Sequence, residues 1–148
     1  MLNNIGWNLN KKFIRIAGGA FPDRLIANDY LLSFINNKAI SQDHILPNNI
    51  NLKFLENKID KFIVHFRDPR QALLSWIYHL DNINENAYFL SELPKGYSDF
   101  NLEKKIDAQI EIHYRKLIIW SEDWLKLIES NDHSFKILVT TYEDFQRD

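Results

Sequence analysis

The sequence contains no cysteine, which excludes disulfide bonds and thiol nucleophiles. No apolar run approaches the length of a membrane-spanning helix, and the asparagine-rich stretch Met1–Asn10 lacks the apolar core of a signal peptide. Neither sign of charge dominates, because 18 lysine and arginine residues oppose 20 aspartate and glutamate residues, for a net charge of -2. Such a surface has no general attraction for nucleic acids. These absences indicate a soluble protein, expected in the cytoplasm, with no membrane segment and no nucleic acid partner.

The composition favours one domain over residues 1–148. Of the 148 residues, 45% are hydrophobic and 26% are charged, which is enough for a single core. The predicted strands cover 12–17, 61–66 and 135–141, and the predicted helices cover 23–36, 50–57, 69–82 and 102–130. Residues 81–101 are predicted to form a loop that can contain a short helix. The alternation of strands and helices predicts an α/β fold.

The junction between the second predicted strand and its following helix has the pattern of an anion site. Asp68 is a favoured N-cap residue, and Pro69 suits the first helical position. A helix therefore begins here, and its free N–H groups and positive dipole end attract anions. Arg67 adds a guanidinium at the end of the strand, and Ser75 adds a hydroxyl two turns along the helix. The alternative is that Arg67 pairs with a neighbouring carboxylate while Ser75 faces solvent.

The segment Arg67–Arg70, followed by Leu73–Trp76, resembles the 3'-phosphate-binding signature of sulfotransferases that use 3'-phosphoadenosine 5'-phosphosulfate (PAPS). The spacing between the arginine and the serine is the same. The resemblance implies that Arg67 and Ser75 hold the 3'-phosphate of PAPS. One departure is Gln71, which stands where the family usually has an acidic residue.

A second segment near the end of the chain, Tyr142–Phe145, resembles the Tyr-Glu-Asp-Leu segment of the same family. The tryptophans at 120 and 124 precede it at helical spacing, as in family members with a tryptophan-rich helix in this place. We interpret both tryptophans as core residues. We likewise interpret Tyr142, Glu143 and Asp144 as structural, capping the next helix and fixing the end of the strand.

The candidate catalytic residue is His44. The segment Gln42–Pro47 resembles the Lys-Thr-His-Leu-Pro segment that holds the catalytic histidine of cytosolic sulfotransferases, although Gln42 and Asp43 replace the lysine and threonine and Ile45 is inserted. Imidazole suits the removal of a proton from the acceptor because its pKa lies near neutrality. Asp43 is the alternative base. The other histidines show no paired ligand spacing, so no metal site is predicted.

The phosphate loop of the family, Pro-Lys-Ser-Gly-Thr-Thr, is not found in this sequence. The nearest segment is Ala17–Arg24, whose glycines permit a tight turn but which lacks the lysine and hydroxyl residues. An ordinary turn from strand to helix is the favoured interpretation, because glycines alone are a weak signal. The alternative is a degenerate loop in which Arg24 replaces the lysine.

The resemblance implies a three-layer parallel sheet with flanking helices, similar to the P-loop nucleotide-binding sulfotransferase fold, and an incomplete domain, because the chain stops before the family's late Arg-Lys-Gly segment. It further implies transfer of a sulfuryl group from PAPS to a hydroxyl or amine of a small molecule or glycan. Two alternatives remain open. One is a non-catalytic or truncated nucleotide-binding domain, and the other is a nucleotide kinase-like phosphate-loop enzyme, for which the Gly-Lys-Ser/Thr loop is missing.

Overall fold

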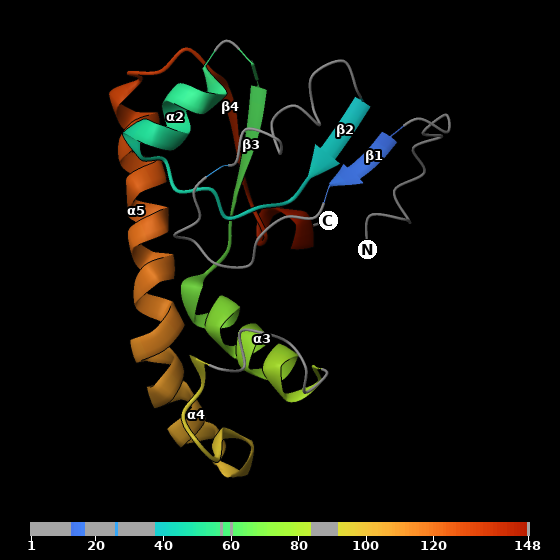
Figure 1. Cartoon of the computed structure of the whole chain (residues 1–148), viewed down its shortest axis with the longest axis vertical. Helices are drawn as coiled ribbons and strands as arrows, with labels where there is room; N and C mark the ends of the chain where they lie inside the picture. Colours follow the sequence, from blue (N-terminus) through green and yellow to red (C-terminus); the bar gives the residue numbers. More distant parts are fainter. Residues whose placement is uncertain are drawn as a thin grey trace. The chain divides into compact units, whose positions relative to one another are not determined.

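The protein is described by a computed structural model, shown in Figure 1, which covers residues 13–16, 26, 38–56, 58–59, 61–83 and 92–147. For 13–16 and 38–41 only the backbone is described. The chain groups into two compact units, Met1–Asp60 and Lys61–Asp148. None of the described helices is both long enough and apolar enough to cross a membrane.

The first unit contains a parallel strand pair and a short helix (Figure 1). Strand β1 (Phe13–Ile16) pairs with β2 (Lys38–Ser41), in a register that sets Phe13 opposite Lys38. Helix α2 (Asn49–Leu55) follows, where a helix over 50–57 was expected. The strand predicted over 12–17 is confirmed in its central part, whereas β2 was not predicted. The predicted helix 23–36 lies outside the described residues except for Ile26, which has no regular secondary structure.

Asn51 connects three parts of the first unit through hydrogen bonds. Its side chain is fully buried, and its Oδ1 accepts a hydrogen bond of 2.8 Å from the backbone N–H of Ile26. Its Nδ2 donates to the carbonyl of Leu46, also at 2.8 Å. The side chain of the N-cap residue Asn48 accepts a bond from the Asn51 backbone N–H and so fixes the first turn of α2. Because buried polar groups are costly without partners, this one side chain stabilises the surrounding backbone.

The second unit contains a second parallel strand pair, formed by β3 (Lys61–Phe66) and β4 (Lys136–Thr141). Its helices begin with α3 (Pro69–Asp81) and continue with α4 (Leu102–Gln109), the π-helical turn η4 (Ile110–Tyr114) and α5 (Arg115–Ser130). Short 3-10 helices lie at η3 (Tyr97–Asp99) and η5 (Asp144–Gln146). The strands predicted over 61–66 and 135–141 and the helices predicted over 69–82 and 102–130 are confirmed, within one residue at their ends.

One face of the β3–β4 sheet packs against α5, which runs alongside it (Figure 1). The ring centroid of Phe62 lies 6.4 Å from that of Trp124, and the ring of Phe66 lies 5.9 Å from that of Trp120. Both tryptophans are buried, at 7% exposure for Trp120 and 4% for Trp124, which confirms the interpretation that they belong to the core. The opposite face of the sheet exposes Ile63. The described residues therefore form a mixed α/β structure with parallel strands, in agreement with the predicted α/β class.

A buried polar cluster holds α3 against α4 and the π-helical turn. Lys105 Nζ lies 2.7 Å from a carboxylate oxygen of Asp81, and Trp76 Nε1 donates to the fully buried Gln109 at 3.2 Å. The ring of His113, on the π-helical turn, stacks on Trp76 with 5.0 Å between centroids. Burial raises the pKa of the neighbouring Tyr97 phenol above its ordinary value. These contacts fix the direction of α3, and with it the position of the helix start that bears the candidate site.

Candidate functional site

The start of α3 is capped as the sequence predicts. Asp68 is the N-cap, its Oδ1 accepts a bond of 2.9 Å from the Arg70 backbone N–H, and Pro69 occupies the first helical position. The Arg70 side chain folds back onto the same carboxylate, with Nη2 2.6 Å from Oδ2 and Nε 3.1 Å from Oδ1. Hydrogen bonds from the Arg70 side chain and backbone lower the pKa of the Asp68 carboxyl to about 2. Asp68 is therefore ionised near neutral pH, and it neutralises Arg70.

Arg67 has no acidic partner among the residues that the structure describes. Within the described part of the chain it forms no ion pair, and its Nε is buried without a hydrogen-bond partner. Its guanidinium lies over the ring of Tyr142, with Cζ 4.3 Å from the ring centroid. The alternative in which a neighbouring carboxylate neutralises Arg67 is therefore wrong for the described residues. A buried donor without a partner is uncommon, although among the described residues Tyr97, Gln109 and His113 also have one such atom each.

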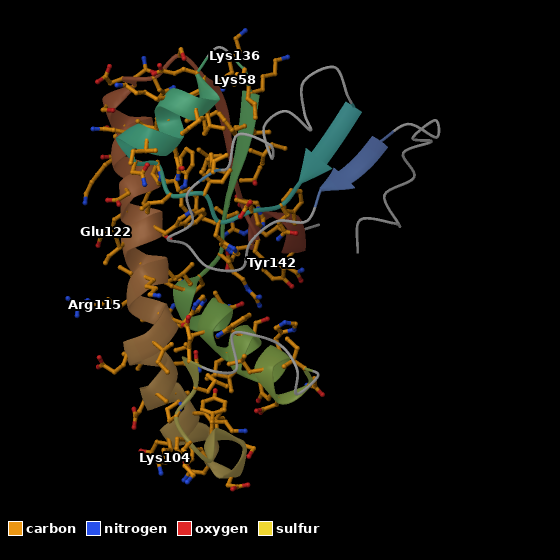
Figure 2. The ribbon with its side chains drawn as sticks, in the orientation of Figure 1. Lys58, Lys104, Arg115, Glu122, Lys136 and Tyr142 are labelled. Carbon is orange, nitrogen blue, oxygen red and sulfur yellow. The ribbon has the colours of Figure 1, made fainter. Side chains whose placement is uncertain are left out.

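The end of β4 meets the end of β3 at this junction. The Tyr142 backbone N–H donates to the carbonyl of Phe66 at 2.8 Å, which extends the parallel ladder by one residue. Glu143 Oε1 then accepts a bond of 3.0 Å from the backbone N–H of Asp68. Figure 2 shows Tyr142 close to the point where β3 passes into α3. Two of the three segments that resemble sulfotransferase sequences, those around Arg67 and Tyr142, are thus in direct contact.

Hydrogen bonds between Thr141 and Asp144 stabilise the turn that follows β4. The Asp144 carboxylate accepts a bond from the Thr141 hydroxyl, and the same hydroxyl accepts a bond from the Asp144 backbone N–H. Together with the Glu143 contact, these bonds fix the end of β4 as predicted, whereas Glu143 at the N-cap of η5 makes no side-chain capping bond, so the predicted capping of the next helix is not observed. The contact of Tyr142 with Arg67 was not predicted. The signal for it was that both segments directly follow a predicted strand, since the carboxyl ends of parallel strands lie at the same edge of a sheet.

Ser75 lies on the solvent side of α3. The buried residues of this helix, Leu73, Ile77 and Leu80, share one face, and the helical period puts Ser75 on the opposite face. At 1.5 Å per residue, Ser75 is about 10 Å along the helix axis from the N-cap Asp68. Arg67 and Ser75 form no hydrogen bond with each other. An anion held by both must therefore bridge them.

His44 belongs to the first unit, between β2 and α2, and its side chain is half-buried. Its backbone N–H donates to Oδ1 of Asp43 at 2.9 Å, so this carboxylate binds the backbone of its neighbour. Arg67 and Ser75 belong to the second unit. The role of His44 as a base, and that of Asp43 as its alternative, stay predictions.

The segment Ala17–Arg24, considered above as a turn or a degenerate phosphate loop, lies outside the described residues. Among the side chains that are described, no group of three or more histidine, aspartate or glutamate residues could hold a metal ion. The described candidate site therefore consists of the Arg67 junction, Ser75 and, separately, the segment around His44.

Comparison of the chain with protein families, with curated proteins and with solved structures found no match. The resemblance to sulfotransferases rests on the short segments around Arg67, His44 and Tyr142 alone. What those residues can do follows from their geometry and charge.

Proposed function

We propose that the Arg67 junction binds the 3'-phosphate of a PAPS-type nucleotide and that the chain is a sulfotransferase domain. The observation that carries the proposal is the state of Arg67, a cation at the carboxyl end of a parallel strand with a buried Nε and no acidic partner among the described residues. A phosphate would supply the missing acceptor through a charge-assisted hydrogen bond. Ser75 would add a second hydrogen bond from the exposed face of α3.

The position of the junction supports nucleotide binding on general grounds. Open parallel sheets bind ligands beyond the carboxyl ends of their strands, and a helix N-terminus favours anionic groups there. Among the described residues of this junction, Glu143 accepts the Asp68 N–H and Arg70 is neutralised by Asp68, which leaves Arg67 as the cation for a ligand. The finer fold that goes with the proposal is a three-layer parallel sheet with flanking helices, similar to the P-loop nucleotide-binding sulfotransferase fold.

The proposed reaction is transfer of the sulfuryl group from PAPS to a hydroxyl or amine. The acceptor oxygen or nitrogen forms a bond to sulfur while the bond from sulfur to the bridging phosphate oxygen breaks. His44 takes the acceptor proton as general base. The acceptor is a small molecule or a glycan.

We expect Arg67→Ala to lower the affinity for 3'-phosphoadenosine 5'-phosphate by a factor of roughly 10 to 100, because a charge-assisted hydrogen bond is lost. Isothermal titration calorimetry measures this change. Arg70→Ala is the matched control, since it removes the same charge three residues away, where the side chain is 82% exposed and paired with Asp68. Its affinity is expected to stay within about twofold of wild type.

A comparison of two nucleotides tests whether the site recognises the 3'-phosphate. Wild type is expected to bind 3'-phosphoadenosine 5'-phosphate more tightly than adenosine 5'-phosphate, and Arg67→Ala is expected to lose most of this preference. If wild type binds the two nucleotides equally, or if the Arg67 and Arg70 variants weaken binding alike, the 3'-phosphate site is wrong.

His44→Gln is expected to reduce sulfuryl transfer by a factor of about 100 or more while leaving nucleotide affinity unchanged, because a general base acts on the acceptor. The measurement is transfer of radiolabelled sulfate from PAPS to pooled phenols, sugars and peptides. His65→Gln is the control, since His65 is exposed on β3 and bonded to Thr140. If Asp43→Asn abolishes transfer and His44→Gln does not, the base is Asp43.

One observation favours the alternative of a non-catalytic nucleotide-binding domain. The only glycine-rich segment of the chain, Ala17–Arg24, has no lysine to stabilise charge as sulfur transfers. A protein that binds 3'-phosphoadenosine 5'-phosphate through Arg67 but transfers no sulfate to any pooled acceptor would be a non-catalytic nucleotide-binding domain.

A further inference from the structure

The outer face of α5 combines exposed apolar side chains with charges of both signs. Trp120 and Trp124 are buried on the inner face, whereas Ile119 is 47% exposed and Leu125 is 44% exposed. A shallow groove with a volume of about 440 Å³ runs along this region, and its lining residues are Ile110, Glu111, Tyr114, Arg115, Ile118, Ile119 and Glu122. Figure 2 shows Arg115 and Glu122 on the side of the helix away from α3. This is an unpartnered helix face with polar edges among the described residues.

The charges on this face alternate along the helix. Glu111, Arg115, Glu122 and Lys126 follow one another as acid, base, acid and base. The inner pair, Arg115 and Glu122, is seven residues apart, which returns to the same face after two turns. Both the inner pair and the outer pair, Glu111 with Lys126, have their midpoint between residues 118 and 119. The charge pattern is therefore reversed in sign about the centre of the exposed apolar stretch.

We propose that this face of α5 binds the same face of a second copy of the chain, with the two helices antiparallel. A two-fold axis through the midpoint sets Arg115 opposite Glu122 of the second copy, and it sets Glu111 opposite Lys126. Ile118 then packs against Ile119 of the other copy at the centre. A parallel arrangement in register would instead oppose like charges at all four positions, which is repulsive. The proposal does not depend on nucleotide binding.

The charges on this face are available for such contacts. Lys126 lies 3.7 Å from Glu122 within the same helix, but their side chains are 69% and 58% exposed. Exposed pairs of this kind contribute little to stability, so a second copy can rearrange them at small cost. A single helix pair buries less area than a standard interface, and the dimer is accordingly expected to dissociate in the range of about 10–100 µM.

Sedimentation equilibrium over a range of concentrations tests the proposal. Arg115→Glu places acid against acid twice in the symmetric dimer and is expected to weaken it about tenfold. The double variant Arg115→Glu with Glu122→Arg exchanges both charges and is expected to restore most of the affinity. Lys136→Glu, at an exposed position on β4, makes the same charge change away from this face and is expected to behave as wild type.

Single cysteines test the direction of the helices, because the chain has no cysteine of its own. Ile118→Cys lies beside the proposed axis and is expected to form a disulfide-linked dimer on mild oxidation. Glu111→Cys would be about 22 Å from its copy in the antiparallel dimer and is expected to stay reduced, since a disulfide needs Cα atoms within about 7 Å.

The proposal is overturned if wild type shows no dimer at about 500 µM, where a 10–100 µM dimer would be well populated. A dimer that Arg115→Glu leaves unchanged would use another surface, and so would one that the double variant fails to restore. Cross-linking through both cysteine positions would indicate a parallel arrangement and contradict the antiparallel one.

Discussion

Replacing Trp124 by alanine is expected to lower the free energy of unfolding of the second unit by about 3–5 kcal/mol. The side chain is 4% exposed, and its ring packs at 6.4 Å from that of Phe62 on β3. Phe62 in turn makes an edge contact with Phe135, with 5.0 Å between the ring centroids. Alanine would leave a cavity between α5 and the sheet at the centre of this aromatic group. Because small domains are stable by only about 5–15 kcal/mol, the loss is a large fraction of the total.

Urea unfolding followed by tryptophan fluorescence measures this loss in the second unit, because Trp76 and Trp120 remain there as probes. Phe145→Ala is the matched control, since it also removes an aromatic ring but from a side chain that is 69% exposed. Its expected cost is less than about 1 kcal/mol. Equal losses for the two variants would show that α5 does not hold the sheet in the way described.

The parts of the fold that the sequence predicts are those with long periodic patterns. The helix over 102–130 has apolar residues at helical spacing throughout, and β3 is a six-residue run bounded by a cap and a proline. Strand β2 was missed because Lys38–Ser41 contains only Ala39 and Ile40 as apolar residues, too few for a pattern. The π-helical turn was missed because it adds a residue to one turn without interrupting the apolar pattern.

At the candidate site, contacts between neighbouring residues could be predicted from the sequence, whereas contacts between residues far apart in the chain could not. Asp68 and Pro69 are predictable because capping depends on neighbouring residues alone. The contact between Glu143 and the Asp68 backbone joins positions 75 residues apart. Its geometry depends on the register of β3 and β4. The sequence therefore identifies Arg67 as a candidate ligand-binding residue but does not show that Tyr142 lies against it.

The environment of His44 likewise depends on a residue that sequence patterns did not single out. Asn51 lies in α2, where an asparagine reads as an ordinary polar residue, yet its side chain is fully buried. Its Nδ2 bonds the carbonyl of Leu46, two residues after His44. The backbone of the proposed catalytic segment is therefore held by an amide outside that segment.

Asn51→Leu is expected to lower the free energy of unfolding of the first unit by about 2–5 kcal/mol. Leucine has a similar size but leaves the buried N–H of Ile26 and the carbonyl of Leu46 without their partners, and each lost partner costs about 1–3 kcal/mol. Amide hydrogen exchange measures the effect directly, since the Ile26 N–H should lose its protection. Asn49→Leu is the control, because Asn49 is exposed at the start of the same helix.

The Asn51→Leu variant also tests sulfuryl transfer and nucleotide binding separately. Loss of the Asn51 bond to Leu46 should disturb the segment that holds His44, whereas the Arg67 junction lies in the other unit and is held by its own contacts. Under conditions where Asn51→Leu remains folded, sulfate transfer is expected to fall by a factor of about 10 or more while affinity for 3'-phosphoadenosine 5'-phosphate stays unchanged. Equal losses of transfer and affinity would mean that nucleotide binding depends on the first unit as well.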